Sequence, residues 1–493
     1  MLDAFIQLFE LQNILFLVLG TALGIVVGAI PGLTASMLIA LTLPLTFHMD
    51  PVAAVTLLIG EYVGGISGGL ITAILLRMPG TPASIVTTFD GYPMAQQNKA
   101  ERALALGIMA SVVGGIISWF FLAGMSPALA EFALQFGPWE YFALVVMALV
   151  MLAVLAQGSL AKGLLAAALG MAFAIPGIDS SIGQARLTFG NSALLTGFGL
   201  LPVLIGAFAI SQVIRDACAP PMTQKVPVPQ KRLPIFGSDV KTHGLNMIRS
   251  SVIGTWIGLL PGIGANIAAL VSYSTAKQVS KEPEKFGKGH EPGVVAGEAA
   301  NNASIGGALI PLITMGIPGS VTEAILIGAL TIHNLQPGPL LFQNAPEVAY
   351  GIIAAYLVAN VIMLLMMWGA VKYIAQVVRI PRSALLSVVL VFCVVGSYAV
   401  NSNFTDVWVM VAFGVIGLGL EAARVPLGPF VIGFVLSPIA EEQLRASLMM
   451  TDGDVTEILS RPYALLFLVL AVLTVAWPAV VARFKPARKE EMK

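Results

Sequence analysis

The sequence predicts an all-α polytopic membrane protein built from two inverted-topology repeats with broken helices and re-entrant hairpins. Two observations on composition support this fold class. Of 493 residues, 57% are hydrophobic and only 11% are charged, and mean hydropathy is +0.89. Soluble proteins carry roughly 25% charged residues, so this chain cannot build a water-facing surface of the necessary size. The third observation is a duplicated Pro-Gly motif, which is described below.

Apolar segments follow one another along most of the chain. The first begins near Asn13 and has no Lys or Arg before it, so we expect a retained span and not a cleaved signal peptide. A crossing of the hydrocarbon layer needs about 20 residues, and several segments are shorter. The expected spans are 13–30, 33–47, 52–77, 103–124, 139–156, 160–176, 193–214, 246–260, 263–276, 298–317 with 321–332, 347–370, 383–400, 405–422, 427–440 and 462–482.

Basic residues are concentrated between particular spans, although the net charge is zero. They cluster in the polar segment from Arg215 to Arg249, in the segment from Lys277 to Lys288, and in the tail from Arg483 to Lys493. Cytoplasmic loops carry an excess of Lys and Arg, so we place these three segments inside the cell. The N-terminus is then outside and the C-terminus inside. A zero net charge also excludes a nucleic-acid binder that relies on bulk electrostatics.

Two sequence motifs occur twice, in the same order. Gly24–Ser36 (GIVVGAIPGLTAS) matches Gly254–Asn266 (GTWIGLLPGIGAN), and Glu61–Gly80 matches Glu298–Gly319 through a Glu, a Gly-Gly pair and a closing Pro-Gly. Chance or shared Gly-rich composition is the weaker explanation, because two independent matches keep their order.

The charges of equivalent loops predict that the two copies are inverted. The first motif leads to a loop without Lys or Arg (Phe47–Pro51) in one copy and to the Lys277–Lys288 run in the other. Such inversion is typical of secondary transporters. The predicted domains are residues 1–214 as the first transmembrane repeat, 215–245 as a cytoplasmic linker, 246–450 as the second, inverted repeat, and 451–493 as an extra C-terminal transmembrane helix with a basic cytoplasmic tail.

Four Pro-Gly breaks predict the binding site. Pro lacks an N–H and Gly tolerates unusual backbone angles, so each pair interrupts its helix. The free N–H groups at the start of the next helix attract anions, although packing kinks between small residues would leave the same pattern. If the four starts converge, they form a site for a carboxylate that needs few cationic side chains. The candidate substrate-binding residues are Gly32, Thr34, Ser36, Gly80, Thr81, Ser84, Gly262, Asn266, Gly319 and Ser320.

Glu298, Asn301 and Asn302 are candidates for binding a coupling ion. Acidic and amide side chains inside membrane segments are costly and usually functional, and their oxygens could coordinate Na⁺. Binding of a coupled proton, or simple helix capping, are the alternatives, and Glu61 occupies the equivalent place in the first copy. The scattered histidines and two cysteines, Cys218 and Cys393, have no metal-binding spacing, so we expect no cofactor beyond Na⁺ or H⁺.

The strings Gly68–Ala95, which contains PGTPAS and DGYPMA, and Gly297–Ser320, which contains EAANNA, identify the family. Over essentially the whole chain, the sequence resembles the large membrane subunit of tripartite tricarboxylate transporters (TctA type). This resemblance implies a cation-driven symporter in the bacterial inner membrane, importing citrate, a dicarboxylate or an aromatic acid. It also implies a small four-span membrane subunit and a periplasmic substrate-binding protein as partners.

Two other function classes remain at this point. An intramembrane enzyme such as a protease would need a catalytic constellation such as paired intramembrane aspartates, and no such pair occurs. A passive anion channel is the other alternative, distinguished by transport that ignores Na⁺ and proton gradients. We therefore predict a carrier that is not an enzyme, with elevator-like alternating access by analogy with other inverted-repeat carriers.

Overall fold

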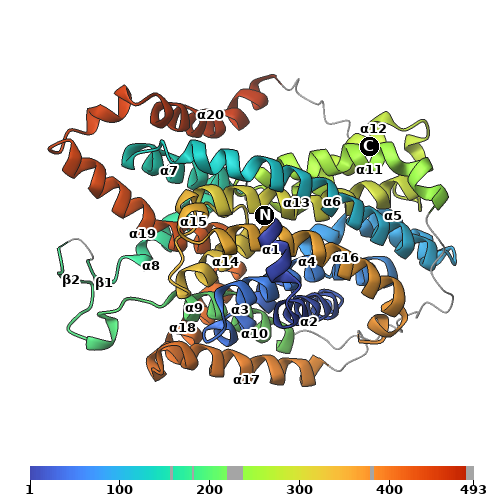
Figure 1. Ribbon diagram of the computed structural model, residues 1–493, viewed down its shortest axis with the longest axis horizontal. Helices are drawn as coiled ribbons and strands as arrows, with labels where there is room; N and C mark the ends of the chain where they lie inside the picture. The colour runs from blue at the N-terminus through green and yellow to red at the C-terminus, as the bar shows by residue number, and fades with distance from the viewer. Residues whose placement is uncertain (156–158, 180–181, 219–236, 378–381, 485–493) are drawn as a thin grey trace, which may run out of the picture. The chain divides into compact units, whose positions relative to one another are not determined.

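A computed structural model describes residues 1–155, 159–179, 182–218, 237–377 and 382–484. Most of these residues are helical (Figure 1), and β1 (Gly177–Ile178) and β2 (Ala185–Arg186) form one short antiparallel pair. The α-helices are α1 (Leu2–Leu8), α2 (Leu11–Gly28), α3 (Ala35–Thr46), α4 (Pro51–Leu76), α5 (Thr87–Gln96), α6 (Ala100–Ala133), α7 (Pro138–Leu155), α8 (Leu160–Ala174), α9 (Leu200–Leu204), α10 (Ser211–Cys218), α11 (Gly237–Leu259), α12 (Gly264–Val279), α13 (Glu291–Met315), α14 (Val321–Ile332), α15 (Pro339–Asn344), α16 (Pro346–Val377), α17 (Arg382–Asn401), α18 (Phe404–Ala422), α19 (Leu427–Met450) and α20 (Pro462–Phe484).

Several helices differ from the expected spans by only one or two residues at each end, whereas α6, α11, α13, α16 and α19 each extend seven to ten residues beyond one expected end. Among the described residues, six helices are long and apolar enough to cross a membrane. This confirms an all-α, multi-pass membrane protein. The six are Leu11–Gly28, Pro51–Leu76, Ala100–Ala133, Leu200–Cys218, Pro346–Ile374 and Phe404–Ala422.

The expected span at 193–214 is the clearest misplacement. Residues 192–194 form a 3₁₀ turn, and the helical stretch begins only at Leu200, continues through a π-helical turn at Ile205–Ile210 and ends at Cys218. Gly197 and Gly199 break the apolar run, since Gly197 has φ = +70°. Helices α1, α5 and α15 are short and were not expected. Of the proposed linker, 219–236 lies outside the described residues, as does the tail from 485 to 493.

The contacts divide the chain into two compact units. One contains Met1–Leu134 and Phe198–Gly419, and the other contains Gln135–Gly197 and Leu420–Lys493. In the smaller unit, α7 packs against α20 and α19 packs against α8. The Asp179 carboxylate of this unit binds Arg445 at 2.8 Å. The predicted repeat boundaries describe sequence similarity and remain a prediction.

The two copies of the first motif pack in the same way within the larger unit. Helix α2 lies along α4, and α11 lies along α13. A Cβ atom at Gly28 would stand 2.2 Å from the Gly65 carbonyl oxygen, and one at Gly258 would stand 2.3 Å from the Ser304 carbonyl oxygen. Only glycine permits backbones to approach this closely. The orientation of these helix pairs relative to a membrane remains a prediction.

Ionised side chains join helix ends near one polar face of the larger unit. Arg102 of α6 donates to both oxygens of Asp239, at 2.6 and 2.7 Å, and to both oxygens of Glu291, at 2.9 Å each. His243 lies 3.1 Å from Glu291. Hydrogen bonds from His243 and Arg102 lower the pKa of Glu291, which precedes the predicted span at 298–317, to about 2. The cluster therefore ties α6, α11 and α13 together.

The loop between α12 and α13 is held by a single carboxylate. Asp90 Oδ1, on α5, accepts hydrogen bonds from the backbone N–H groups of Gly287, Gly289 and His290 at 2.8–2.9 Å. Its Oδ2 accepts from the Tyr273 hydroxyl at 2.8 Å. Asp90 is fully buried. Most of the segment Lys281–Lys288 is exposed, and Asp90 anchors the C-terminal end of the loop.

Candidate functional site

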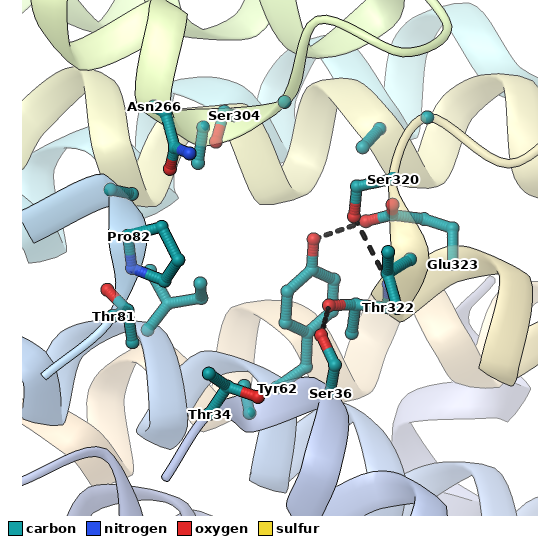
Figure 2. A pocket seen from close by; sticks show the side chains of 18 of the residues that line it. Thr34, Ser36, Tyr62, Thr81, Pro82, Asn266, Ser304, Ser320, Thr322 and Glu323 are labelled. Atoms are coloured by element: carbon teal, nitrogen blue, oxygen red, sulfur yellow. Dashed lines mark hydrogen bonds between the residues drawn. The ribbon is translucent and has the colours of Figure 1, made fainter. Parts of the chain in front are cut away.

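A cavity of about 210 Å³ lies in the larger unit, where the Pro-Gly breaks converge. Figure 2 shows that its polar side chains come from segments that are far apart in the sequence. Its volume is below the roughly 300–1,000 Å³ typical of sites for drug-sized ligands, so it suits a smaller solute. The polar lining side chains belong to Thr34, Ser36, Tyr62, Thr81, Asn266, Ser304, Ser320, Thr322 and Glu323.

Helices α3 and α14 begin at this cavity, and each has a hydroxyl N-cap. Thr34 Oγ1 accepts a hydrogen bond from the Met37 N–H, and Ser320 Oγ accepts from the Thr322 N–H, both at 3.2 Å. Such caps satisfy one of the free N–H groups at a helix start. The remaining N–H groups of the first turns and the dipole of each helix favour negative charge nearby.

The third and fourth breaks have different local structures. Helix α12 begins at Gly264 and brings Asn266 to the cavity. The Thr81 break leads only to a short 3₁₀ turn, Pro82–Ile85, in which Thr81 and Ser84 form a reciprocal capping box. The prediction that small polar residues open the next helix therefore describes α3, α12 and α14, and α5 begins later, at Thr87.

The structure brings Thr34, Ser36, Thr81, Asn266, Gly319 and Ser320 together around the cavity. The other four candidates do not line it. Ser84 directs its hydroxyl to the Thr81 carbonyl oxygen at 2.8 Å. Gly80 packs against the Gly28 carbonyl oxygen, and Gly32 lies beside the side chains of Gln212 and Asp216. The Gly262 N–H donates a hydrogen bond to the Gly319 carbonyl oxygen at 2.8 Å. These four residues shape the turns that carry the lining side chains.

Sequence reasoning missed Tyr62, Ser304, Thr322 and Glu323. Tyr62 directly follows the motif residue Glu61, and its hydroxyl donates a hydrogen bond to Glu323 Oε1. Ser304 follows the Asn pair by less than one turn, on the face that Asn301 also occupies. Thr322 and Glu323 complete the Pro-Gly-Ser-Val-Thr-Glu segment, so the fourth break itself contained the signal for both.

The ion-binding candidates lie on α13, outside the cavity lining. Thr87 donates a hydrogen bond to Glu298 Oε1, and Ser111 donates to Oε2 at 3.2 Å. Asn302 Nδ2 donates to the Ser111 carbonyl oxygen and to Asn360 Oδ1, both at 2.6 Å. Asn302 Oδ1 has no hydrogen-bond partner among the described residues, and neither does the Asn301 amide, which lies beside Glu298.

Oxygen ligands for a cation are therefore present, but they are dispersed. The free oxygens belong to buried amides, and both Glu298 oxygens already accept hydrogen bonds from hydroxyls. The described residues contain no cluster of three or more His, Cys, Asp or Glu side chains that could hold a metal ion. These residues suit a weakly held Na⁺ or a proton better than a divalent ion.

None of the described residues that line the cavity is Lys, Arg or His. Arg77, which lies two residues before the Pro79-Gly80 break, follows the end of α4 in the left-handed conformation with φ = 58°. Its guanidinium lies 5.8 Å from the centre of the Tyr92 ring and does not line the cavity. Among the described lining residues, the groups that favour an anion are therefore the helix starts and the hydroxyl or amide donors.

Together, the cavity with its hydroxyl, amide and carboxyl side chains, the broken helices and the long apolar helices are typical of a multi-pass membrane transporter. The family model of the tripartite tricarboxylate transporter TctA family matches residues 14–432. The chain belongs to this family, and it is therefore a membrane component of a transport system with further subunits. Family membership groups it with transporter components and not with enzymes.

Two relatives come from Agrobacterium vitis. One, described as an uncharacterized 52.8 kDa protein in the TAR-I ttuC' 3' region, is 35% identical over 94% of this chain and 93% of its own length. The other, an uncharacterized protein in the TAR-II ttuC' 3' region, is 33% identical over 45% of this chain and 92% of its own length. No solved structure matches the chain.

Proposed function

We propose that this chain is the permease subunit of a cation-coupled symporter that imports a small carboxylate across the bacterial inner membrane. The observation that carries the proposal is the cavity itself. Helix starts from both sequence copies meet there, with hydroxyl and amide donors and no basic lining residue. Carboxylates are bound by such N–H and hydroxyl groups without a permanent counter-charge. The substrate is a tricarboxylate such as citrate, a dicarboxylate or an aromatic acid.

The proposed partners are a periplasmic protein that delivers the substrate and a small four-span membrane subunit. Family membership supports this assembly, because the system is tripartite. We assign coupling to Na⁺ or H⁺ bound near Glu298, Asn301 and Asn302, where buried amide oxygens lack partners. Movement of the hairpin-bearing parts against a scaffold, as in elevator carriers, would expose the cavity to each side in turn.

Uptake by the reconstituted three-component system tests this proposal. Radiolabelled citrate, succinate and benzoate are offered to proteoliposomes under separately imposed Na⁺ and pH gradients. We expect accumulation of at least one of them, driven by one gradient and dependent on the binding protein. Equilibration that ignores both gradients and needs no binding protein would instead indicate a passive anion channel. Chemical conversion of the acid without transport would indicate an enzyme.

Variants on α13 test the ion-coupling assignment separately. Asn302→Ala removes the amide that joins Ser111 and Asn360, and it should uncouple or abolish gradient-driven uptake. Ser397→Ala is a matched control, because Ser397 is also a buried polar residue of an apolar helix but lies outside this network. Equal gradient-driven uptake in Asn302→Ala and wild type would contradict the assignment.

A further inference from the structure

Glu323 places a fully buried carboxyl group in the wall of the cavity. It lies in the first turn of α14, directly after the fourth Pro-Gly break. The Tyr62 hydroxyl, from α4, donates a hydrogen bond to Oε1. Oε2 has no hydrogen-bond partner of normal geometry among the described residues, although the Ser320 hydroxyl and backbone lie beside the group. Figure 2 shows the side chain pointing from α14 toward Tyr62 and Ser320.

Helix capping alone does not explain this arrangement. The Ser-x-x-Glu pattern of Ser320 to Glu323 is that of a capping box. In a capping box, the glutamate would accept from the backbone N–H of its N-cap residue. Here the Tyr62 hydroxyl, on a helix of the other sequence copy, donates to Glu323 as well, and the Ser320 hydroxyl and backbone lie beside the same carboxyl group. Oε2 is therefore a buried carboxyl oxygen in the cavity wall without a hydrogen-bond partner of normal geometry among the described residues.

The charges around Glu323 decide its protonation state when the cavity is occupied. Helices α3, α4, α9 and α13 pack against α14, and α3 and α9 contain no titratable residue. Glu61 of α4 accepts from Thr42, and Glu298 of α13 accepts from Thr87 and Ser111, so both face other partners. Glu291 binds Arg102 at the start of α13. Tyr62, a donor, is therefore the titratable group of these helices in contact with Glu323.

A carboxylate solute and an ionised Glu323 would place two negative charges in one cavity without a basic lining residue. Burial of an uncompensated charge is costly, and a helix N-terminus offsets only part of that cost. A protonated Glu323 removes the repulsion and adds a donor. Hydrogen bonds from a carboxylic acid to a carboxylate are short and strong.

We propose that Glu323 binds one proton together with each carboxylate anion and donates it, through Oε2, as a hydrogen bond to that anion. Tyr62 holds Oε1 and so directs Oε2 at the solute. The inference rests on the proposed function, because it assumes a carboxylate substrate. The inference adds to the proposed function a residue whose protonation makes substrate binding depend on pH. The same residue favours solutes that accept a hydrogen bond. The proton stays on the Glu323–anion pair, and it is taken from water on binding and returned to water on release.

Binding of radiolabelled succinate, citrate and benzoate to the full chain in lipid nanodiscs, between about pH 6 and pH 9, tests the proposal. We expect wild-type affinity to fall about tenfold per pH unit once Glu323 is ionised in the free protein. Glu323→Gln keeps a donor that cannot titrate, so its affinity should remain constant with pH. Glu140→Gln, a matched loss of a buried carboxylate in the other compact unit, should keep the wild-type pH dependence. Tyr62→Phe should weaken binding about fivefold and keep its pH dependence.

Proton uptake by the wild-type protein provides a measurement that needs no variant. In weakly buffered solution, at a pH where wild-type affinity already falls with pH and succinate itself is fully ionised, about one proton should be taken up per succinate bound. Binding without proton uptake overturns this inference and leaves the proposed function intact. So does an unchanged pH dependence in Glu323→Gln. Complete loss of binding in a folded Glu323→Gln would overturn it too, because an ionised carboxylate would then be the required ligand. Absence of binding by any of the three acids removes the proposed function and this inference with it.

Discussion

Ser36 Oγ and Thr322 Oγ1 lie 2.7 Å apart, although 286 residues separate them in the sequence. Each is the second residue of its helix, and each follows a hydroxyl N-cap, Thr34 and Ser320 respectively. The two helix starts are therefore joined at the wall of the cavity by the side chains that follow their Pro-Gly breaks (Figure 2). Ser36 belongs to the first sequence copy, and Thr322 belongs to the second.

Removal of this hydrogen bond should destabilise the protein modestly. We expect Ser36→Ala and Thr322→Val each to lower the free energy of unfolding, with a coupling energy of about 1 kcal/mol in a double-mutant cycle. Thermal unfolding of purified protein in one detergent measures it. Strictly additive effects of the two substitutions would show that the contact does not stabilise the fold.

Asn266→Leu should impair uptake without unfolding the protein. The substitution keeps the side-chain size, but it replaces amide donors at the cavity with methyl groups. We expect uptake to fall at least about tenfold, as one or two lost hydrogen bonds to a charged group imply. Asn344→Leu, an exposed position outside the cavity, is the matched control. Equal uptake by both variants would place substrate binding elsewhere.

Gly28→Ala and Gly258→Ala should each destabilise the protein by about 1–3 kcal/mol, because the added Cβ overlaps a facing carbonyl oxygen. Gly124→Ala is the matched control in α6, since no atom lies within 4 Å of its Cβ position. That variant should be neutral or slightly stabilising. Melting temperatures of the three purified variants test this expectation. A loss in Gly124→Ala equal to that in Gly28→Ala would contradict the steric explanation.

The Arg102 cluster should lose its stabilising effect in acid. The pKa of Glu291 is lowered from 4.5 to about 2 in the folded protein, so its contribution is present above about pH 4.5. It should be lost as the pH falls toward 2. Relative to Glu291→Gln, the wild type should therefore be more stable at neutral pH, and the difference should shrink below about pH 4.5. Melting temperatures across this range measure it, and Glu284→Gln on the exposed loop serves as control. A constant difference would exclude Glu291 as the titrating group.

Asp90→Ala should loosen the loop before α13. The substitution leaves three backbone N–H groups and the Tyr273 hydroxyl without their shared acceptor, which should cost at least about 2 kcal/mol. We expect faster trypsin cleavage after Lys285 and Lys288 and faster hydrogen exchange at Gly287–His290. Glu282→Gln breaks only an exposed pair with Lys285 and should leave both rates unchanged. Wild-type rates in Asp90→Ala would show that other contacts hold the loop.

Most helices could be predicted because their determinants are local. Apolar runs and Pro-Gly pairs set the bounds of α3, α4 and α14 to within two residues of those observed. The misplaced start of the 193–214 segment also has a local cause, since Gly197 and Gly199 lie inside an otherwise apolar run. Hydropathy alone does not register such a break.

The site could be predicted only in part, because its contacts join distant segments. Thr34, Ser36 and Ser320 could be predicted from the sequence, because each closely follows a Pro-Gly break. Tyr62 and Glu323 become partners only when α4 packs beside α14, which no local pattern specifies. Ser84 shows the opposite error. A serine at this position was predicted to bind substrate, but its hydroxyl donates a hydrogen bond to the Thr81 carbonyl oxygen within its own turn.

The contact of α2 with α4 at Gly28 has a mechanical consequence. Backbone atoms meet there with no side chains between them, so no rotamer change can absorb a relative shift of the two helices. If the helices move during transport, we expect α2 and α4 to move together, and α11 with α13 likewise at Gly258. Relative movement would then be easier at contacts made by single hydroxyls, such as Ser36 with Thr322, where one hydrogen bond can be exchanged for another.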